Sequence, residues 1–397
     1  YKLNDFRPYI YKTDDYGDSW DRIDDGLPED MFVRVVREDP QQRGLLYAGT
    51  ENAIFVSFDD GDEWESLQGN LPVVPITDLR VRHDDLVAAT QGRSYWVLDD
   101  LAVVRQMARA SSDDALSVFV APQVPKMRSR RSSRSGEGAN PTYGATFRYF
   151  IRDEQDTPLT IEIRNQAGDM VRSYSSEETD FERCIVANMD QRLPFEVKYP
   201  PTEQGMNKWT WDLKRNGLEC IEDVAMFSGF RGPSAAAGEY TATFRIGGAS
   251  ASVDFSVIED PRIEATDEQR DFHEQKIDEI TALFNTVIVQ LGAARRARAQ
   301  IEALLDVYPA SDDLKSLAEP AIMRLQAWDE AVTQKMHETY EDEDSWPNLL
   351  DAQIRFLLDS IDRGGPPVTA GSMMRLDDLE AEWSLRDDEM RAIVSEH

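Results

Sequence analysis

The sequence predicts a multidomain protein of mixed β and α class, with partial β-propeller blades, a β-sandwich and a C-terminal antiparallel helical bundle. Three observations predict this order. Short strand-like runs alternate with Asp/Gly turns over residues 1–107, period-2 alternation recurs over 145–260, and heptad patterns fill 261–397. The 397 residues are enough for two to four domains of ordinary size.

The composition indicates a folded, acidic protein. Hydrophobic residues make up 41% of the chain, which is enough for real cores, and no run of about 18 apolar residues predicts a membrane span. The net charge of −32 repels phosphate backbones and argues against nucleic-acid binding. The chain begins with Tyr and shows no signal peptide, so we expect it to be part of a longer polypeptide.

Residues 1–107 contain two copies of the turn pattern S/T-x-D-x-G-x-x-W, 44 residues apart. The copies consist of Thr13, Asp15, Gly17 and Trp20, and of Ser57, Asp59, Gly61 and Trp64. We expect the Asp to bond turn amides, the Gly to supply a positive φ, and the Trp to start the next strand and pack under the turn. A calcium-ligand role for the two aspartates is the alternative. Repeats at this spacing in an all-β region are typical of propeller blades.

The turn pattern is that of the Asp-box, or BNR repeat, and 46–57 and 85–100 add to the likeness. The region resembles the last blades of the bacterial BNR/sortilin-like β-propeller proteins, a family often labelled glycosyl hydrolase. The resemblance implies about two to two and a half blades here, whereas a propeller needs about four to close. The missing blades are therefore expected as partners, in the same polypeptide or on another chain. Arg93, Tyr95 and Trp96 either line a central cavity or pack within a blade.

Residues 108–144 are predicted to be a linker with a basic cluster at 126–135. The cluster is a contact for an anionic glycan or acidic partner, a protease-sensitive joint, or a solvated connection. No aromatic residues interleave with its arginines, which argues against single-stranded nucleic acid as a ligand.

Residues 145–260 alternate as strands of a β-sandwich. The segment 159–174 reads as a hairpin, and 205–213 places Trp209 and Trp211 on one face. This region resembles the immunoglobulin-like modules of flagellar hook-capping proteins and of secreted bacterial enzymes. The two tryptophans either fill the core or stack on a sugar.

The remainder, 261–397, is predicted to be helical. Thr266 and Gln269 form a capping box, and a heptad register predicts one helix over 267–307. Pro309 and Ser311 separate it from a second helix, and two more helices follow, with a break at 364–367. The family named above carries such a tail. It is either an arm through which the protein forms oligomers or a self-contained bundle.

The sequence contains no recognisable catalytic or cofactor motif. Its two cysteines, Cys184 and Cys220, lie 36 positions apart and predict a disulfide, with two free thiols as the alternative. None of the four histidines pairs with a nucleophile or a second metal ligand in a known spacing, so no metal or cofactor is expected. Catalytic residues are not assigned.

Two functional hypotheses remain. The first is a non-catalytic binding or assembly portion of an extracellular or periplasmic protein that recognises a protein, peptide or glycan. The second is part of a glycoside hydrolase or lyase whose active site lies in upstream blades. Whether the protein is an enzyme stays open at this point, because a fold alone does not decide function.

Overall fold

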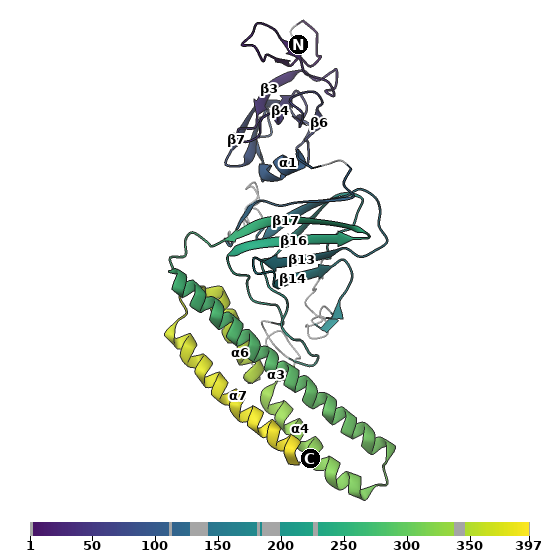
Figure 1. Ribbon diagram of the computed structural model, residues 1–397, viewed down its shortest axis with the longest axis vertical. Helices are drawn as coiled ribbons and strands as arrows, with labels where there is room; N and C mark the ends of the chain where they lie inside the picture. The colour runs from purple at the N-terminus through teal and green to yellow at the C-terminus, as the bar shows by residue number, and fades with distance from the viewer. Residues whose placement is uncertain are drawn as a thin grey trace.

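Figure 1 shows the computed structural model, in which three regions follow one another along a long axis: small sheets at the N-terminal end, a β-sandwich, and a helical arm. The structure describes residues 3–110, 113–127, 142–180, 183–184, 199–224, 229–336 and 346–396. Over these ranges the fold is mixed β and α, with several small sheets and five helices. Its strands form no closed ring of blades within the described part of the chain.

The N-terminal region contains three antiparallel sheets of two, four and three strands, each a simple meander. The strands are β1 (Tyr11–Lys12) and β2 (Asp21–Arg22); β3 (Val33–Glu38), β4 (Leu46–Thr50), β5 (Ile54–Ser57) and β6 (Glu65–Ser66); and β7 (Ile76–Arg82), β8 (Asp85–Thr90) and β9 (Tyr95–Leu98). Helix α1 (Leu101–Met107) follows β9.

The four-stranded sheet is covered on both faces by its neighbours. Tyr47 on one face packs with Ile76 of the third sheet and Leu101 of α1, while Phe55 on the other packs with Ile10 near β1. Every residue of β4 and β5 is therefore buried. Burial on both faces explains why these two strands read as continuous apolar runs without alternation.

The middle region consists of two sheets packed around one core, with strand orders β10-β12-β15 and β11-β17-β16-β13-β14. The strands are β10 (Leu116–Phe119), β11 (Gln123–Pro125), β12 (Ala145–Ile151), β13 (Thr160–Asn165), β14 (Met170–Ser175), β15 (Gly205–Trp211), β16 (Gly238–Ile246) and β17 (Ala249–Ile258). Trp211 is fully buried in this core, and Trp209 is half-buried beside Tyr174, with ring centroids 5.5 Å apart. Neither indole ring is freely exposed for stacking on a sugar.

The segment 108–144, predicted to be a linker, contributes two strands to the sandwich. β10 pairs antiparallel with β12, and β11 pairs parallel with β17. The strands are only four and three residues long, and β17 lies more than 120 residues further along the chain. Such distant pairing leaves little local signal in the sequence. Residues 128–135 of the basic cluster lie outside the described residues, and the role of the cluster remains a prediction.

Over its described residues, the helical arm has four helices around one apolar core. They are α3 (Asp267–Val307), α4 (Asp312–Val332), α6 (Leu350–Gly364) and α7 (Ala370–Glu396). α4 and α6 both pack on α3, and α7 runs along α4 and α6 (Figure 1). The predicted capping box is present at Thr266, whose hydroxyl accepts the Gln269 N–H. An ion pair between Arg324 and Glu396 holds the end of α7 against α4.

Helix α3 contains an 18-residue window that is apolar enough to cross a membrane, and 44% of that window is buried inside the protein. Its core positions Ile280, Phe284 and Leu291 are fully buried against the other helices of the arm. Core packing therefore accounts for the apolar character of this helix.

The sandwich and the arm share contacts of two kinds. Leu218 and Phe230, from the long connection between β15 and β16, are part of the apolar core of the arm. Cys184 and Cys220 form a disulfide, and Cys220 packs against the same core. The connection is thereby held to both regions.

Candidate docking face at the N-terminal end

The first repeated turn is closed by its own side chains. The Thr13 hydroxyl donates to Asp15 Oδ1 at 2.8 Å and accepts the Gly17 N–H at 2.8 Å. Asp15 in turn accepts the N–H of Ser19 at 2.8 Å and its hydroxyl at 2.6 Å. These hydrogen bonds from Ser19 and Thr13 hold the pKa of the Asp15 carboxyl well below its usual range. Gly17 has φ +100°, which few other residues adopt without strain.

The second repeated turn has the same hydrogen bonds as the first, apart from the one that the Ser19 hydroxyl donates. The Ser57 hydroxyl donates to Asp59 Oδ1 and accepts the Gly61 N–H, both at 2.8 Å, and Asp59 accepts the Glu63 N–H at 3.0 Å. Gly61 also has φ +100°. Both aspartates are therefore engaged in bonding turn amides, the structural role expected of them.

The tryptophans that end the two turns differ sharply in burial. Trp64 is 3% exposed, and its indole N–H donates to the Ile23 carbonyl at 2.8 Å while its backbone N–H donates to that of Asp25 at 3.0 Å. Trp64 thus packs against the segment that follows the preceding turn. Trp20, the counterpart in the first copy, is 58% exposed.

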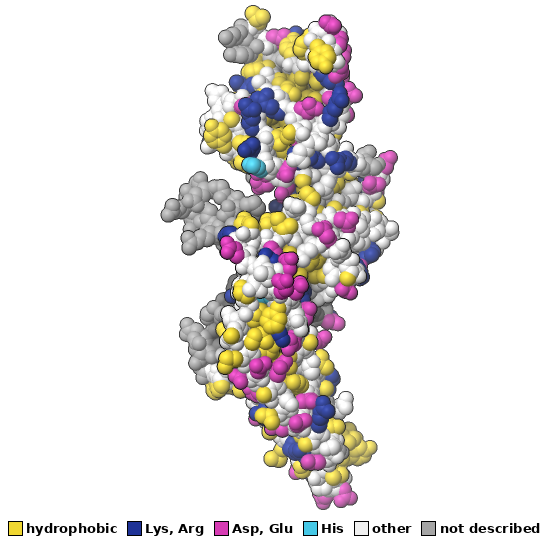
Figure 2. All heavy atoms as spheres, turned by 60° about the vertical axis from the view of Figure 1, so that its left-hand side comes forward, with side chains coloured by type: hydrophobic (Ala, Val, Ile, Leu, Met, Phe, Trp, Pro, Cys, Tyr) yellow, Lys and Arg dark blue, Asp and Glu magenta, His cyan; other side chains and the backbone are white. Residues whose placement is uncertain are grey.

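The N-terminal segment that ends at Trp20 has many exposed apolar side chains. Those at least 40% exposed between residues 3 and 20 are Leu3, Phe6, Tyr9, Tyr11, Tyr16 and Trp20, here called the N-terminal face. Figure 2 shows hydrophobic side chains at this end of the molecule among charged ones. A groove of about 680 Å³ runs beside the face, between Tyr9, Phe32 and Val33. Its rim is charged, with Arg7 paired to Asp5 at 2.8 Å. Leu3 and Tyr9 of the face line this groove, and exposed apolar side chains beside a charged rim are typical of an interaction site.

Arg93, Tyr95 and Trp96 were predicted either to line a cavity or to pack within a blade. The structure places Trp96 differently from the other two. Trp96 in β9 packs against the core between the second and third sheets, and its indole N–H donates to the Arg93 carbonyl at 3.0 Å. Arg93 and Tyr95 are exposed. The packing alternative fits Trp96, and a cavity-lining role for the exposed Arg93 and Tyr95 stays a prediction.

Opposite the N-terminal face, α1 is joined to the sheets by a buried ion pair. The Arg105 guanidinium donates to Asp39 at 2.9 Å and to Asp84 at 2.5 Å, and the Tyr47 hydroxyl donates to Asp39 at 3.0 Å. Burial alone would raise the pKa of Asp39, but the Arg105 and backbone hydrogen bonds outweigh it and lower that pKa. Through Arg105, Asp84 thus ties α1 to the turn between β7 and β8.

The two histidines within the described ranges lie in different regions of the molecule. His83 lies exposed in the turn between β7 and β8, and His273 is buried where α3 meets the end of α6. The other two, at positions 337 and 397, lie outside the described residues. Over the described ranges no three His, Cys, Asp or Glu side chains are placed to hold a metal ion.

Comparisons with known proteins give no family for this chain. No family model matches it, and no curated protein is significantly similar. Among solved structures, the extracellular domain of a proposed one-component system from B. thetaiotaomicron is 9% identical over 63% of this chain and 28% of its own, with a TM-score of 0.19. The extracellular domain of a proposed hybrid two-component system from the same organism is 7% identical over 64% of this chain and 34% of its own, with a TM-score of 0.20.

The chain thus spans about a third of the length of the structures it matches. Scores at this level carry no argument about fold or function.

Sequence reasoning identified the repeated turns but not the N-terminal face. The available signal was the density of aromatic residues in 3–20, next to strands of only two residues each. Such short strands cannot bury that many rings by themselves.

Proposed function

We propose that this chain is a non-catalytic binding and assembly portion of a larger assembly, and that its N-terminal face docks another β-sheet of the same repeat. The occupant belongs either to the same polypeptide or to another chain. In this proposal the sandwich and the helical arm hold the docked sheets at a distance from other parts of the assembly.

The observation that carries the proposal is the contrast between Trp64 and Trp20. The two turns share most of their hydrogen bonds, yet within the described residues Trp64 packs against the segment after the other turn, whereas Trp20 is exposed. The segment that covers Trp64 lies about 40 residues before it. At the same spacing, the segment that covers Trp20 would not belong to any of the three small sheets described here. Burial of a large aromatic side chain contributes roughly 2–3 kcal/mol, so an occupant gains substantially from covering the whole face.

We assign finer identities as part of the same proposal. The small sheets are blades of an Asp-box propeller of the BNR/sortilin-like kind, and the sandwich is an immunoglobulin-like module. The protein works in an extracellular or periplasmic compartment, because a disulfide such as Cys184–Cys220 persists in oxidising surroundings. The eventual partner recognised by the assembly is a protein, a peptide or a glycan.

Hydroxyl-radical footprinting tests the proposal, with Trp20 as the probe and Trp64 as the internal control. In the isolated chain Trp20 should be oxidised readily and Trp64 slowly. In the whole protein purified from its source, Trp20 should become protected while Trp64 stays unchanged. Equal oxidation of Trp20 in both preparations would contradict docking at this face. Turnover of a glycan by the whole protein, abolished by one carboxylate substitution, would contradict the non-catalytic assignment.

A further inference from the structure

The second repeated turn is covered by residues 23–27, which follow β2 and are here called a covering segment. The Ile23 carbonyl accepts the Trp64 indole N–H at 2.8 Å, and the Asp25 carbonyl accepts the Trp64 backbone N–H at 3.0 Å. Gly26 has φ +89°, and a Cβ added there would lie 2.6 Å from the Trp64 carbonyl oxygen. A residue other than glycine at this position would therefore clash with the backbone of Trp64.

The side chains of this covering segment complete the contact. A Cβ added at Gly61 would lie 2.6 Å from a side-chain carbon of Ile23, so the Ile23 side chain lies directly over that glycine. Leu27 is 7% exposed and belongs to the same apolar core as Trp64. A covering segment thus supplies two backbone carbonyls, two aliphatic side chains and one glycine to the turn that it covers.

A second covering segment, residues 67–71, follows the second repeated turn. The Leu67 N–H donates to the Ile54 carbonyl at 2.9 Å. The equivalent bond in the first segment is the one that the Ile23 N–H donates to the Ile10 carbonyl at 3.0 Å. Each segment begins three residues after its tryptophan and ends in a Leu that Pro follows. Leu67 packs against the core that contains the third sheet, so each repeat covers the sheet that comes after it in the chain.

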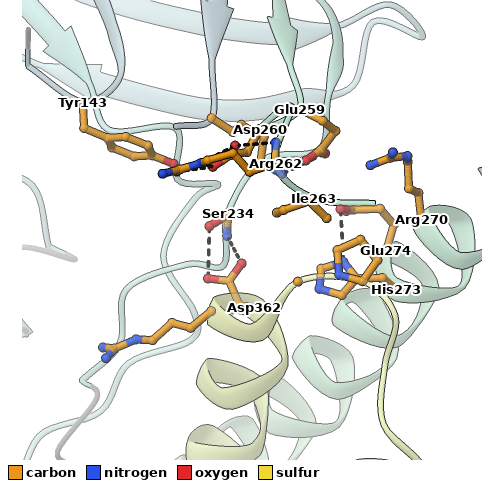
Figure 3. Close-up of a pocket in the computed structure, with 14 residues that line it drawn as sticks. Tyr143, Ser234, Glu259, Asp260, Arg262, Ile263, Arg270, His273, Glu274 and Asp362 are labelled. Carbon is orange, nitrogen blue, oxygen red and sulfur yellow. Dashed lines mark hydrogen bonds and ion pairs between the residues drawn. The ribbon is translucent and has the colours of Figure 1, made fainter. Parts of the chain in front are cut away.

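The joint between the sandwich and the helical arm shows a contact that the chain closes by itself. A cavity of about 190 Å³ lies there, and its lining includes Lys126, Arg270 and Asp362 (Figure 3). Asp362 pairs with Lys214 at 2.6 Å and accepts the Ser234 N–H at 2.9 Å. The buried carboxylate of this joint thus has its partners within the same chain, as is usual for buried polar groups.

The first repeated turn lacks both contacts that the covering segment makes with the second. Trp20 is 58% exposed, and its indole N–H makes no hydrogen bond with any residue in the described part of the chain. A Cβ added at Gly17 would have only the ring of Trp20 within 4 Å, whereas the equivalent Gly61 lies under Ile23. The missing cover is therefore a segment with the chemistry of residues 23–27.

We propose that the N-terminal face is occupied by the covering segment of one further repeat, placed ahead of Trp20 in the same polypeptide. This segment follows the pattern Trp-x-x-Ile/Leu-x-x-Gly-Leu-Pro. The carbonyl of its Ile or Leu accepts the Trp20 indole N–H, and the side chain of that residue lies over Gly17. Its glycine allows close approach to the Trp20 backbone. The inference rests on the proposed function and adds to it the chemical identity of the occupant.

An extended chain tests the assignment. A second copy of residues 9–52 is inserted ahead of residue 9 of the full chain, which keeps the 44-residue spacing of the repeats. The inserted copy carries Trp20→Phe, so that the signal of Trp20 comes from the original position alone. Hydroxyl-radical oxidation of Trp20 should then fall to the rate of Trp64, in proportion to exposed fractions of 58% and 3% in the present chain.

Two variants of the inserted copy provide matched controls. Ile23→Asp in the copy should return Trp20 to its original rate of oxidation, because a charged side chain cannot be buried over Gly17 without a partner. Glu29→Ala in the copy changes an exposed residue just beyond the covering segment, and it should leave Trp20 protected.

Two results would overturn the assignment: an extended chain in which Trp64 is protected while Trp20 is oxidised as before, or equal oxidation of Trp20 in the two control variants. If the extended chain does not fold, so that Trp64 also loses its protection, Ile23→Asp in the unextended chain decides the question. Oxidation of Trp64 should rise in that variant, and an unchanged rate would contradict the covering role of residues 23–27.

Footprinting of the whole protein from its source separates this inference from the proposed function. Protection of Trp20 in the whole protein, without protection in the extended chain, would leave docking at the N-terminal face intact and refute only the identity of the occupant. Exposure of Trp20 in both preparations would refute the two together.

Discussion

The two repeated turns show how the same sequence pattern acquires different surroundings. Thr13–Trp20 and Ser57–Trp64 have matching hydrogen bonds and glycines of equal φ, yet Trp64 is buried and Trp20 is exposed. The turn is a local structure that its own side chains complete. Burial of the tryptophan depends on a neighbouring sheet. The motif by itself therefore specifies the hydrogen-bonded turn, and the packing of one sheet on another buries the tryptophan.

The largest expected difference comes from removing each tryptophan in turn. Trp64→Ala should destabilise the N-terminal region by about 3–5 kcal/mol, because it leaves a cavity between two sheets. Trp20→Ala should cost less than about 1 kcal/mol in the isolated chain, because its ring is already in water. Denaturant unfolding followed by near-ultraviolet circular dichroism measures both. Equal losses would mean that Trp20 is covered in solution.

The ion pairs at the two ends of the N-terminal region sharpen the comparison. Arg105→Ala leaves the buried Asp39 carboxylate without its cation and should cost about 3–5 kcal/mol. Arg7→Ala removes the exposed pair with Asp5 and should leave stability unchanged within error. Thermal unfolding of the two variants provides the measurement. A clear loss in Arg7→Ala would indicate that the N-terminal face is ordered by contacts absent from this structure.

The helical arm supplies a pH-dependent contrast with the N-terminal region. Asp351 is fully buried, and burial raises the pKa of its carboxyl to about 7, although hydrogen bonds from Thr333 and Ala352 oppose the shift. In the unfolded chain this group ionises near pH 4. Between about pH 4 and 7 the folded state binds more protons, so stability should fall as pH rises through this window and level off above it.

The expected loss from this group is roughly 2–4 kcal/mol. Asp351→Asn should abolish it, whereas Asp378→Asn, at an exposed site in the same arm, should retain it. Helix unfolding at 222 nm between pH 4.5 and 8 checks the prediction. A pH profile of Asp351→Asn identical to that of the unmodified chain would refute it.

The smallest expected difference separates the two glycines. A Cβ added at Gly61 would lie 2.6 Å from a side-chain carbon of Ile23. A Cβ added at Gly17 would lie 3.8 Å from its nearest atom, a ring carbon of Trp20. Gly17→Ala should cost about 1 kcal/mol from backbone strain alone, and Gly61→Ala about 1–3 kcal/mol more from overpacking. Chemical denaturation of both variants tests this. Equal costs would show that Ile23 moves aside without penalty.

The long helix and the repeated turns could be predicted because their signals are local. Thr266 and Gln269 mark the start of α3, Ser311 caps α4, and the turn pattern specifies its own hydrogen bonds. The two strands within 108–144 were missed because their partners, β12 and β17, are distant and the strands are short. The cavity at the joint was missed for a similar reason: Lys126, Arg270 and Asp362 lie far apart in the chain.

The sequence by itself determined the local structures: turns closed by Asp, Ser and Gly, strands set by alternation, and helices set by heptads and caps. These depend on residues within a few positions of one another. Only the tertiary structure decided that Trp64 is covered while Trp20 is not, that Asp351 is isolated from water, and that Arg270 Nη1 is buried with no hydrogen-bond partner among the described residues. Burial and unpaired charge are properties of a three-dimensional neighbourhood, and that neighbourhood is assembled from segments that the linear pattern does not relate.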